Sequence, residues 1–327
     1  MNITRILCPT DFSETSAHAT ELAIVVAGFF KARIWALHVL SPMLMALPGL
    51  AASSAAEASA APDEGKSDGA PSEQARAGAG RAARAEMAQL RQRVAAPFEA
   101  ALATGLGVDV TIDVGHPTAR ILERAATLPA DLIVMGTHGT SGFEHLVLGS
   151  VTEKVLRRAP CPVLTVPPRA QATSQVPFQR MLCAIDFSAS SLAALQYAVS
   201  LARQSNAALT LLHVLEWPWD EPPAPKIEDL PPAQGSALAE FRRYCEVSAQ
   251  TRLQSLVPHS APLGHPPTAR LRSGKPHVQI LEVAAEEHSD LVVIGVQGRN
   301  PLDRALFGST ANQVVRRATC PVLTLRR

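Results

Sequence analysis

The sequence contains few cysteines, few aromatic residues and almost no net charge. Five cysteines occur in 327 residues, without a CxxC pair, which argues against a disulfide framework and indicates a reducing compartment. Aromatic residues make up 4%, and the formal net charge is +1. This composition predicts neither a base-stacking surface nor a basic field for nucleic acid. No HExxH or other metal-ligand spacing occurs in the sequence, so we predict no metal site made by the protein alone.

Long hydrophobic runs are also missing. The longest early apolar stretch, residues 22–30, is too short to span a bilayer, and the first residues lack the apolar core of a signal peptide. We therefore expect a cytoplasmic chain that contacts neither membrane nor nucleic acid. Hydrophobic residues still make up 47% of the chain, which is enough for compact cores, and the length predicts two domains.

An internal repeat organises the chain. RILCPTDFS at 5–13 returns as RMLCAIDFS at 180–188, and residues 131–166 align with 290–325 without a gap, at 16 identical positions of 36. The offset between the copies falls from 175 residues at their start to 159 at their end. A period of this size predicts a tandem duplication of a whole domain and excludes a solenoid of short repeats.

The repeat predicts two domains, at residues 1–167 and 178–327. The extra residues of unit one lie in an Ala-, Ser- and Gly-rich stretch at about 46–80, which we interpret as a solvated insertion, with a lid over the site as the alternative. Unit two carries a Pro-rich stretch at about 217–232, which we expect to form an irregular loop.

Strands and helices are predicted to alternate within each unit. Strands are predicted at 3–8, 33–40, 108–113, 132–136 and 163–166, and again at 179–184, 208–215, 268–272, 291–295 and 322–325. Longer helices are predicted at 14–30, 81–104, 189–205 and 235–256, with a kink at Pro97. Buried central strands that alternate with helices indicate an α/β fold built on a parallel, doubly wound sheet in each unit.

A glycine pattern follows the fourth strand of both units. Its frame is G-x2-G-x9-G-S, and it begins at Gly136 in unit one and at Gly295 in unit two. Glycines let backbone N–H groups approach a ligand, and the last pair opens a helix whose N-terminus attracts phosphate. The alternative is structural: Ser150 and Glu153 match a capping box, which needs no ligand.

These residues resemble a known family. GTHGTSGFEHLVLGSVTEKVLRRAPCPVLTV is similar to the C-terminal signature of the ATP-binding branch of the universal stress protein family, and CPTDFS, the HV of the second strand and the GHP turn fit as well. The resemblance implies two tandem Rossmann-like domains of the adenine nucleotide alpha hydrolase-like type, with strand order 3-2-1-4-5. It also implies pairing of the two units through their fifth strands, and a homodimer of the chain is a further expectation.

The resemblance implies a nucleotide site in unit one, with ATP or another adenine nucleotide and Mg²⁺ as its companion. Pro9 and Asp11 would lie beside the ribose, and Val39 would offer its backbone to adenine. The implied binding residues are Pro9, Asp11, Val39, Met135, Gly136, His138, Gly139, Gly149, Ser150 and Val151.

Unit two carries the matching positions with three departures. Ala184 replaces the proline, Gln297 replaces the histidine, and RNPL replaces TSGF inside the glycine loop. The implied binding residues are Asp186, Val214, Ile294, Gly295, Gln297, Gly298, Gly308, Ser309 and Thr310.

Three functions fit this pattern. The resemblance favours an ATP-binding stress-response regulator with little or no turnover. A slow ATP hydrolase is the alternative, although the sequence has no GxxxxGK[ST] loop and no residue that we assign as catalytic. A nucleotide-free dimerisation scaffold is the third, and it would make the stretch from Gly136 to Ser150 purely structural. A bulky residue at Gly139 or Gly149 is predicted to abolish binding in unit one without unfolding the chain.

Overall fold

The computed structural model describes residues 3–41, 73–139, 148–168, 178–217, 232–256, 263–296 and 307–326. Unit one contains the strands β1 (Arg5–Thr10), β2 (Arg33–Leu40), β3 (Val108–Val114), β4 (Leu132–Gly136) and β5 (Val163–Val166). Unit two contains β6 (Arg180–Ala184), β7 (Ala208–Leu215), β8 (Thr268–Ser273), β9 (Leu291–Gly295) and β10 (Val322–Leu325).

The helices of unit one are α1 (Glu14–Phe30), α3 (Glu73–Ala95), α4 (Glu99–Ala103), α5 (Pro117–Thr127) and α6 (Ser150–Arg158), with a 3-10 turn, η2, at Ala96–Phe98. Those of unit two are α7 (Ala189–Ser205), α8 (Pro232–Ser255), α9 (Pro276–Glu286) and α10 (Ser309–Arg317). Within the described ranges, no helix is both long enough and apolar enough to cross a membrane.

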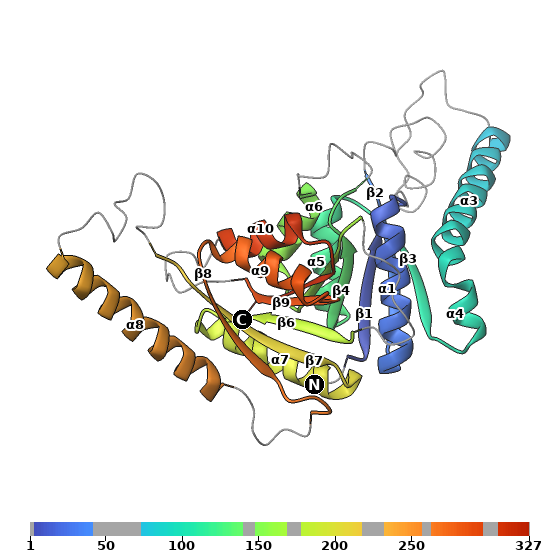
Figure 1. The fold of residues 1–327 in the computed structure, drawn as a ribbon. Coiled ribbons are helices and arrows are strands. Elements are labelled where there is room, and N and C mark those ends of the chain that lie inside the picture. Colours follow the sequence, from blue (N-terminus) through green and yellow to red (C-terminus); the bar gives the residue numbers. More distant parts are fainter. Residues whose placement is uncertain are drawn as a thin grey trace.

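The ten described strands form one sheet in the order β3-β2-β1-β4-β5-β10-β9-β6-β7-β8 (Figure 1). Each half therefore has the order 3-2-1-4-5, and its strands run parallel. Two parallel neighbouring strands need a long crossover connection between them, and the helices of each unit provide these connections. The predicted α/β class and the tandem arrangement are confirmed.

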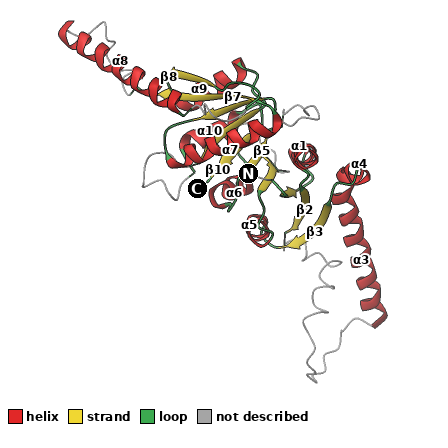
Figure 2. Cartoon of the chain, turned by 90° about the horizontal axis from the view of Figure 1, so that it is seen from below, coloured by secondary structure: helices red, strands yellow, loops and turns green. Residues whose placement is uncertain are grey.

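The halves meet where β5 pairs with β10 in antiparallel register, Leu164 opposite Leu323. Two buried threonines reinforce this pairing symmetrically. Thr165 Oγ1 donates to the Val322 carbonyl, and Thr324 Oγ1 donates to the Val163 carbonyl, both at 3.1 Å. Figure 2 shows the two halves lying on either side of β5 and β10.

Helices cover both faces of the sheet. Successive residues of a strand point to opposite faces, so Ile6 of β1 packs in the core beneath α1, α3, α7 and α8, whereas Leu7 packs in the core beneath α5, α6, α9 and α10. Both side chains are buried to 1% exposure or less. Each unit is thus a three-layer sandwich.

The first helix of each unit has the predicted bounds because its ends carry strong local signals. Ser13 and Ser188 cap α1 and α7, each accepting from the backbone N–H of the third residue that follows, at 3.2 Å. Lys31 and Asn206 end these helices in the left-handed conformation. The caps satisfy backbone groups that would otherwise have no partner.

The second long helix of unit one begins earlier than predicted. It starts at Glu73 rather than residue 81, so the last part of the predicted loop at 46–80 is helical. Alanine, arginine, glutamate and glutamine favour the helix strongly enough to offset Gly78 and Gly80. At Pro97 the chain changes to a 3-10 turn, where the kink was predicted. Residues 46–72, and residues 218–231 of the Pro-rich stretch, lie outside the described ranges.

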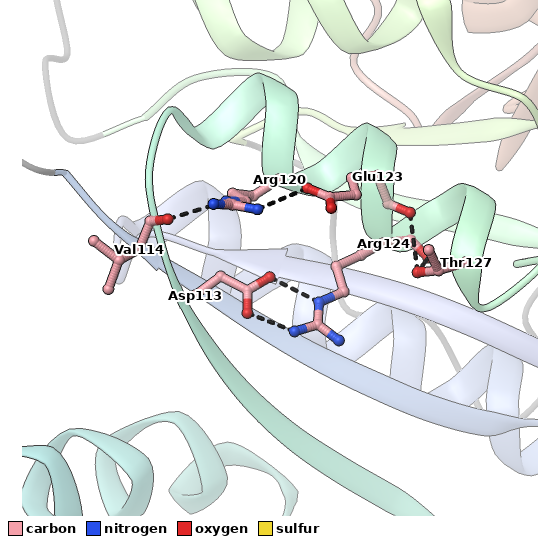
Figure 3. Close-up of polar contacts among 6 residues, drawn as sticks. All are labelled: Asp113, Val114, Arg120, Glu123, Arg124 and Thr127. Carbon is pink, nitrogen blue, oxygen red and sulfur yellow. Dashed lines mark hydrogen bonds and ion pairs between the residues drawn. The ribbon is translucent and has the colours of Figure 1, made fainter. Parts of the chain in front are cut away.

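An ion pair fastens β3 to α5 in unit one (Figure 3). Arg124 donates from Nε and Nη2 to both carboxylate oxygens of Asp113, at 2.7 and 2.6 Å. Arg120 donates from Nε to the Val114 carbonyl and from Nη1 to Glu123. Unit two replaces this pair by one of opposite polarity, in which Arg272 of β8 donates to Glu286 of α9 at 2.5 Å.

Candidate functional site

The candidate sites lie at the carboxyl ends of the central strands. β1 pairs directly with β4, and β6 pairs with β9. The residues that follow these strands therefore lie next to one another, which is where open parallel sheets bind ligands. In unit one these residues include Asp11 and Gly139, and in unit two they include Asp186.

The aspartate after the first strand is held in a tight turn. Asp11 Oδ1 accepts from the backbone N–H of Ser13 at 3.0 Å and from its hydroxyl at 2.5 Å. Asp186 Oδ1 accepts from the backbone N–H of Ser188 at 2.9 Å. These turns fix each carboxylate at the start of the following helix.

Glycines are required where the loop after β4 meets this turn. A Cβ at Gly139 would lie 2.6 Å from Asp11 Oδ2, so the carboxylate lies directly against the loop backbone. A Cβ at Gly136 would lie 2.9 Å from Thr15 of α1, and one at Gly295 would lie 2.8 Å from the backbone of Ser190 in α7. Gly136 and Gly295 therefore serve close helix packing as well as any ligand.

The other predicted residues of unit one occupy the same sheet edge. Pro9 is buried in β1 opposite Leu37, and Val39 lies near the end of β2. Met135 ends β4 together with Gly136, and both are buried. His138 follows: its Nδ1 lies 2.9 Å from Thr137 Oγ1, and its carbonyl accepts from Thr15 Oγ1 at 2.5 Å. Residues 140–147, which include TSGF, lie outside the described ranges.

The helix after the glycine loop begins without a side-chain cap. Gly149 and Gly308 are the N-cap residues of α6 and α10, and neither cap makes a side-chain hydrogen bond. The capping-box interpretation is wrong, because Ser150 is the first helical residue and Glu153 instead accepts from Arg157 at 2.7 Å. Each helix therefore begins, at Ser150–Val151 or Ser309–Thr310, with the positive end of its dipole and without a side-chain cap at its N-cap residue, and such a helix end favours an anion.

A cavity of about 590 Å³ lies at this edge of unit two. Seven predicted residues line it: Asp186, Val214, Ile294, Gly295, Gly308, Ser309 and Thr310. Gln297 and Gly298 lie outside the described residues. Ala184, which stands in the position of Pro9, also lines the cavity.

Ten further lining residues were not predicted from the sequence, among them His213, Glu216, Pro276 and Ile280. Pro276 had a signal in the GKP turn, but Glu216 follows β7 with no motif around it. Burial lowers the pKa of the neighbouring His277, and the positive charges of Arg317 and Lys275 lower it further, against the opposing effect of Glu216. The acidic side chains in the described lining of the cavity are those of Asp186 and Glu216.

Metal coordination by the protein is not indicated in the part of the chain that the structure describes. It contains no group of three or more histidine, cysteine, aspartate or glutamate side chains that could hold an ion. Unit one offers the predicted carboxylate of Asp11, and the cavity of unit two is lined by the carboxylates of Asp186 and Glu216. A cation at either site would need further oxygen ligands, which the phosphates of a nucleotide supply.

Comparison with known sequences gives a consistent result. The sequence profile of the universal stress protein family matches residues 2–167 and 177–326. The chain is 32% identical over 166 residues to a universal stress protein of Methanocaldococcus jannaschii, which covers 50% of this chain and 81% of the relative. It is 29% identical over 209 residues to one of Mycolicibacterium smegmatis, covering 62% of this chain and 63% of the relative.

Solved structures show the same architecture. A universal stress protein from Archaeoglobus fulgidus matches with a TM-score of 0.64 and 24% identity, covering 100% of both chains. A putative universal stress protein from Pseudomonas aeruginosa matches with a TM-score of 0.58 and 18% identity, covering 99% of this chain and 93% of that one. These likenesses extend over both units and support the tandem fold.

Proposed function

The chain belongs to the universal stress protein family, and we propose that it is a regulatory protein that binds adenine nucleotide, ATP with Mg²⁺, in one site per unit. The observation that carries this proposal is the cavity of unit two. It joins Asp186, the glycine at the end of β9 and the N-terminus of α10 in one space. A volume of about 590 Å³ lies within the range of small-ligand and cofactor sites.

The lining of the cavity combines two kinds of chemistry. Gly308 and Ser309 present the start of α10, where backbone N–H groups and the helix dipole favour a phosphate chain. Leu212 and Ile280 add apolar surface that suits a planar base. Asp186 supplies a carboxylate acceptor suited to a ribose hydroxyl. Mg²⁺ would come with the phosphates and neutralise their charge.

Unit one offers the same groups in equivalent places. Asp11 lies against Gly139, and Ser150 begins α6 without a side-chain cap. We therefore propose nucleotide binding there too. The domains would be residues 1–167 and 178–327, paired within one cytoplasmic chain through β5 and β10.

The arrangement supports binding more than turnover. Hydrolysis needs a group that places a water in line with the phosphate. The carboxylate of Asp11 already accepts two hydrogen bonds from Ser13 at Oδ1 and lies against Gly139 at Oδ2. Regulation then follows if nucleotide binds two states of the protein with different affinity.

The test is native mass spectrometry of the full chain, purified gently and then mixed with ATP and Mg²⁺. We expect two adenine nucleotides per chain, and slow or absent phosphate release under the same conditions. One nucleotide per chain would restrict the proposal to a single unit. None would overturn it and favour a scaffold, and rapid phosphate release would favour the hydrolase.

A further inference from the structure

A column of three side chains stands beside the aspartate turn of unit one. The guanidinium carbon of Arg93, on α3, lies 4.1 Å from the ring centroid of Phe12, and this ring lies 4.5 Å from that of His38. His38 Nδ1 is 2.8 Å from the carbonyl oxygen of Thr10. Because a carbonyl only accepts, Nδ1 carries the proton and donates it.

Unit two repeats the column with nearly the same geometry. Arg252 of α8 lies 4.1 Å from the ring centroid of Phe187, which lies 4.5 Å from His213. His213 Nδ1 is 2.6 Å from the Ile185 carbonyl. Phe12 and Phe187 are related by the opening offset of the repeat, 175 residues, whereas Arg93 and Arg252 are related by its closing offset of 159. The columns are therefore equivalent.

The phenylalanine is the strained member of each column. Phe12 and Phe187 adopt φ values of +64° and +63°, a conformation that a residue with a side chain avoids and that persists only where its surroundings enforce it. Each follows the site aspartate directly, Asp11 or Asp186. The arginine over the ring and the histidine bond to the carbonyl of the residue before the aspartate add to the hydrogen bonds of the aspartate turn around this backbone.

In unit two, α8 contacts the cavity rim at a second point. Arg242 lies 5.4 Å from the ring of Trp217, and Trp217 follows the cavity-lining Glu216. Arg242 and Arg252 are ten residues apart on α8, which is about 15 Å along a helix. The helix thus touches the two rim segments after β6 and β7 through two cation–aromatic contacts.

We propose that Arg93 and Arg252 are positioning residues for the two nucleotide sites. Each stacks on the strained phenylalanine and thereby holds the neighbouring aspartate in the orientation that binds nucleotide. The inference rests on the proposed function of the sites and extends it to α3 and α8, which lie at opposite ends of the molecule (Figure 1). A movement of either helix would change the affinity of its own unit only.

The first test isolates unit two by placing Ser150→Glu in unit one, which puts a negative charge at its phosphate end. In this background, calorimetry should show that Arg252→Leu weakens the affinity for ATP about two- to fivefold, which is the effect of losing one exposed cation–π contact. Arg252→Lys should restore most of the affinity because it keeps the cation. Arg243→Leu, at an exposed position of the same helix, is the matched control and should bind as the parent does.

The second test needs no nucleotide. Hydrogen exchange of the backbone amides of residues 186–191 should be faster in Arg252→Leu than in the parent and in Arg252→Lys. Unchanged ATP affinity in Arg252→Leu overturns the inference, whatever the exchange rates. If the wild-type chain takes up no adenine nucleotide, the proposed function fails. Unchanged hydrogen exchange in Arg252→Leu would separately contradict the claim that Arg252 holds the turn at Asp186 and Phe187.

Discussion

Asp131 and Asp290 occupy equivalent positions, and each carboxylate receives the first backbone amides of the neighbouring strand. Asp131 Oδ2 accepts from Thr4 and Arg5 at 3.0 Å, and Asp290 Oδ2 accepts from Gln179 and Arg180 at 2.7 and 3.1 Å. Arg5 adds a guanidinium contact to Asp131 at 3.3 Å, whereas Arg180 Nε donates to the His288 carbonyl.

The pKa values of these two aspartates therefore shift in opposite directions. Burial acts to raise the pKa of Asp131, but hydrogen bonds from Thr4 and Arg5 outweigh it and lower the pKa from 3.8. At Asp290 burial outweighs the hydrogen bonds and raises the pKa. The stability that Asp131 contributes is thus present above pH 3.8 and is lost as the pH falls through its lowered pKa. The stability that Asp290 contributes is greatest below pH 3.8 and is lost as the pH rises through its raised pKa.

Asp131→Asn and Asp290→Asn should therefore respond differently to pH. We expect Asp131→Asn to lower the free energy of unfolding by about 1 kcal/mol at pH 7, and Asp290→Asn to cost less there because it removes a poorly solvated charge. Urea unfolding at pH 7 and pH 4 provides the measurement. The cost of Asp290→Asn should grow at pH 4, and an identical pH response of the two variants would contradict the assignment.

The glycines that end β4 and β9 should not tolerate a methyl group. Gly136→Ala and Gly295→Ala place a Cβ within 2.9 Å of the backbone of α1 and α7, and overpacking of this kind costs about 1–3 kcal/mol. The matched control is Gly28→Ala in the interior of α1, where a Cβ meets nothing within 4 Å. It should stabilise by about 0.5–1 kcal/mol. Thermal unfolding should show a lower melting temperature for Gly136→Ala and Gly295→Ala and a higher one for Gly28→Ala.

A negative charge at the start of α6 or α10 should exclude phosphate without disturbing the fold. Ser150 and Ser309 are exposed first residues of these helices, where glutamate is favoured by the helix dipole. Ser150→Glu or Ser309→Glu should each remove one adenine nucleotide per chain in native mass spectra, whereas the alanine variants should retain both. Retention of two nucleotides by Ser150→Glu would refute the site in unit one.

These serines are better positions for the test than the glycines chosen from the sequence. A Cβ at Gly149 would lie 3.2 Å from the Thr137 carbonyl, and one at Gly308 would lie 2.9 Å from the Val296 carbonyl. Gly149→Val would therefore press on the backbone as well as on a ligand. Loss of binding in that variant would not separate the two effects.

The Asp113–Arg124 ion pair should contribute measurably to stability. Hydrogen bonding to Arg124 lowers the pKa of Asp113, and the carboxylate is only 13% exposed. Asp113→Asn should cost about 1 kcal/mol at neutral pH, and this cost should fade as the pH drops below the lowered pKa. Asp109→Asn is the control, since Asp109 pairs with Arg33 at 41% and 56% exposure. Urea unfolding should show a smaller loss for this control.

Local signals account for the parts of the fold that could be predicted. The starts of α1 and α7 follow from a capping serine, which lies next to the helix in the sequence, and both helices end at a residue in the left-handed conformation. The start of α3 was missed because a low-complexity sequence also reads as a loop, and only its accumulated helix propensity distinguishes the two.

The candidate site also contains residues that a local sequence motif predicts and residues that only the fold brings there. Asp186 and Gly308 belong to a repeated motif, whereas Glu216 reaches the cavity only because β7 ends beside it. Arg93 and Phe12 lie 81 residues apart in the chain and share no motif. Alignment of the two units could have matched Arg93 with Arg252, because these arginines are separated by the closing offset of the repeat. Their contact itself depends on the packing of α3.

The antiparallel pairing of β5 with β10 has a consequence for inheritance. A dimer of identical chains carries every substitution twice, so neither binding site can change alone. Here each half of the sheet is encoded by its own stretch of one gene, so a difference such as Ala184 in place of Pro9 is confined to one unit. Because the paired strands run in opposite directions, the candidate sites at the carboxyl ends of the two sets of strands also lie at opposite edges of the sheet.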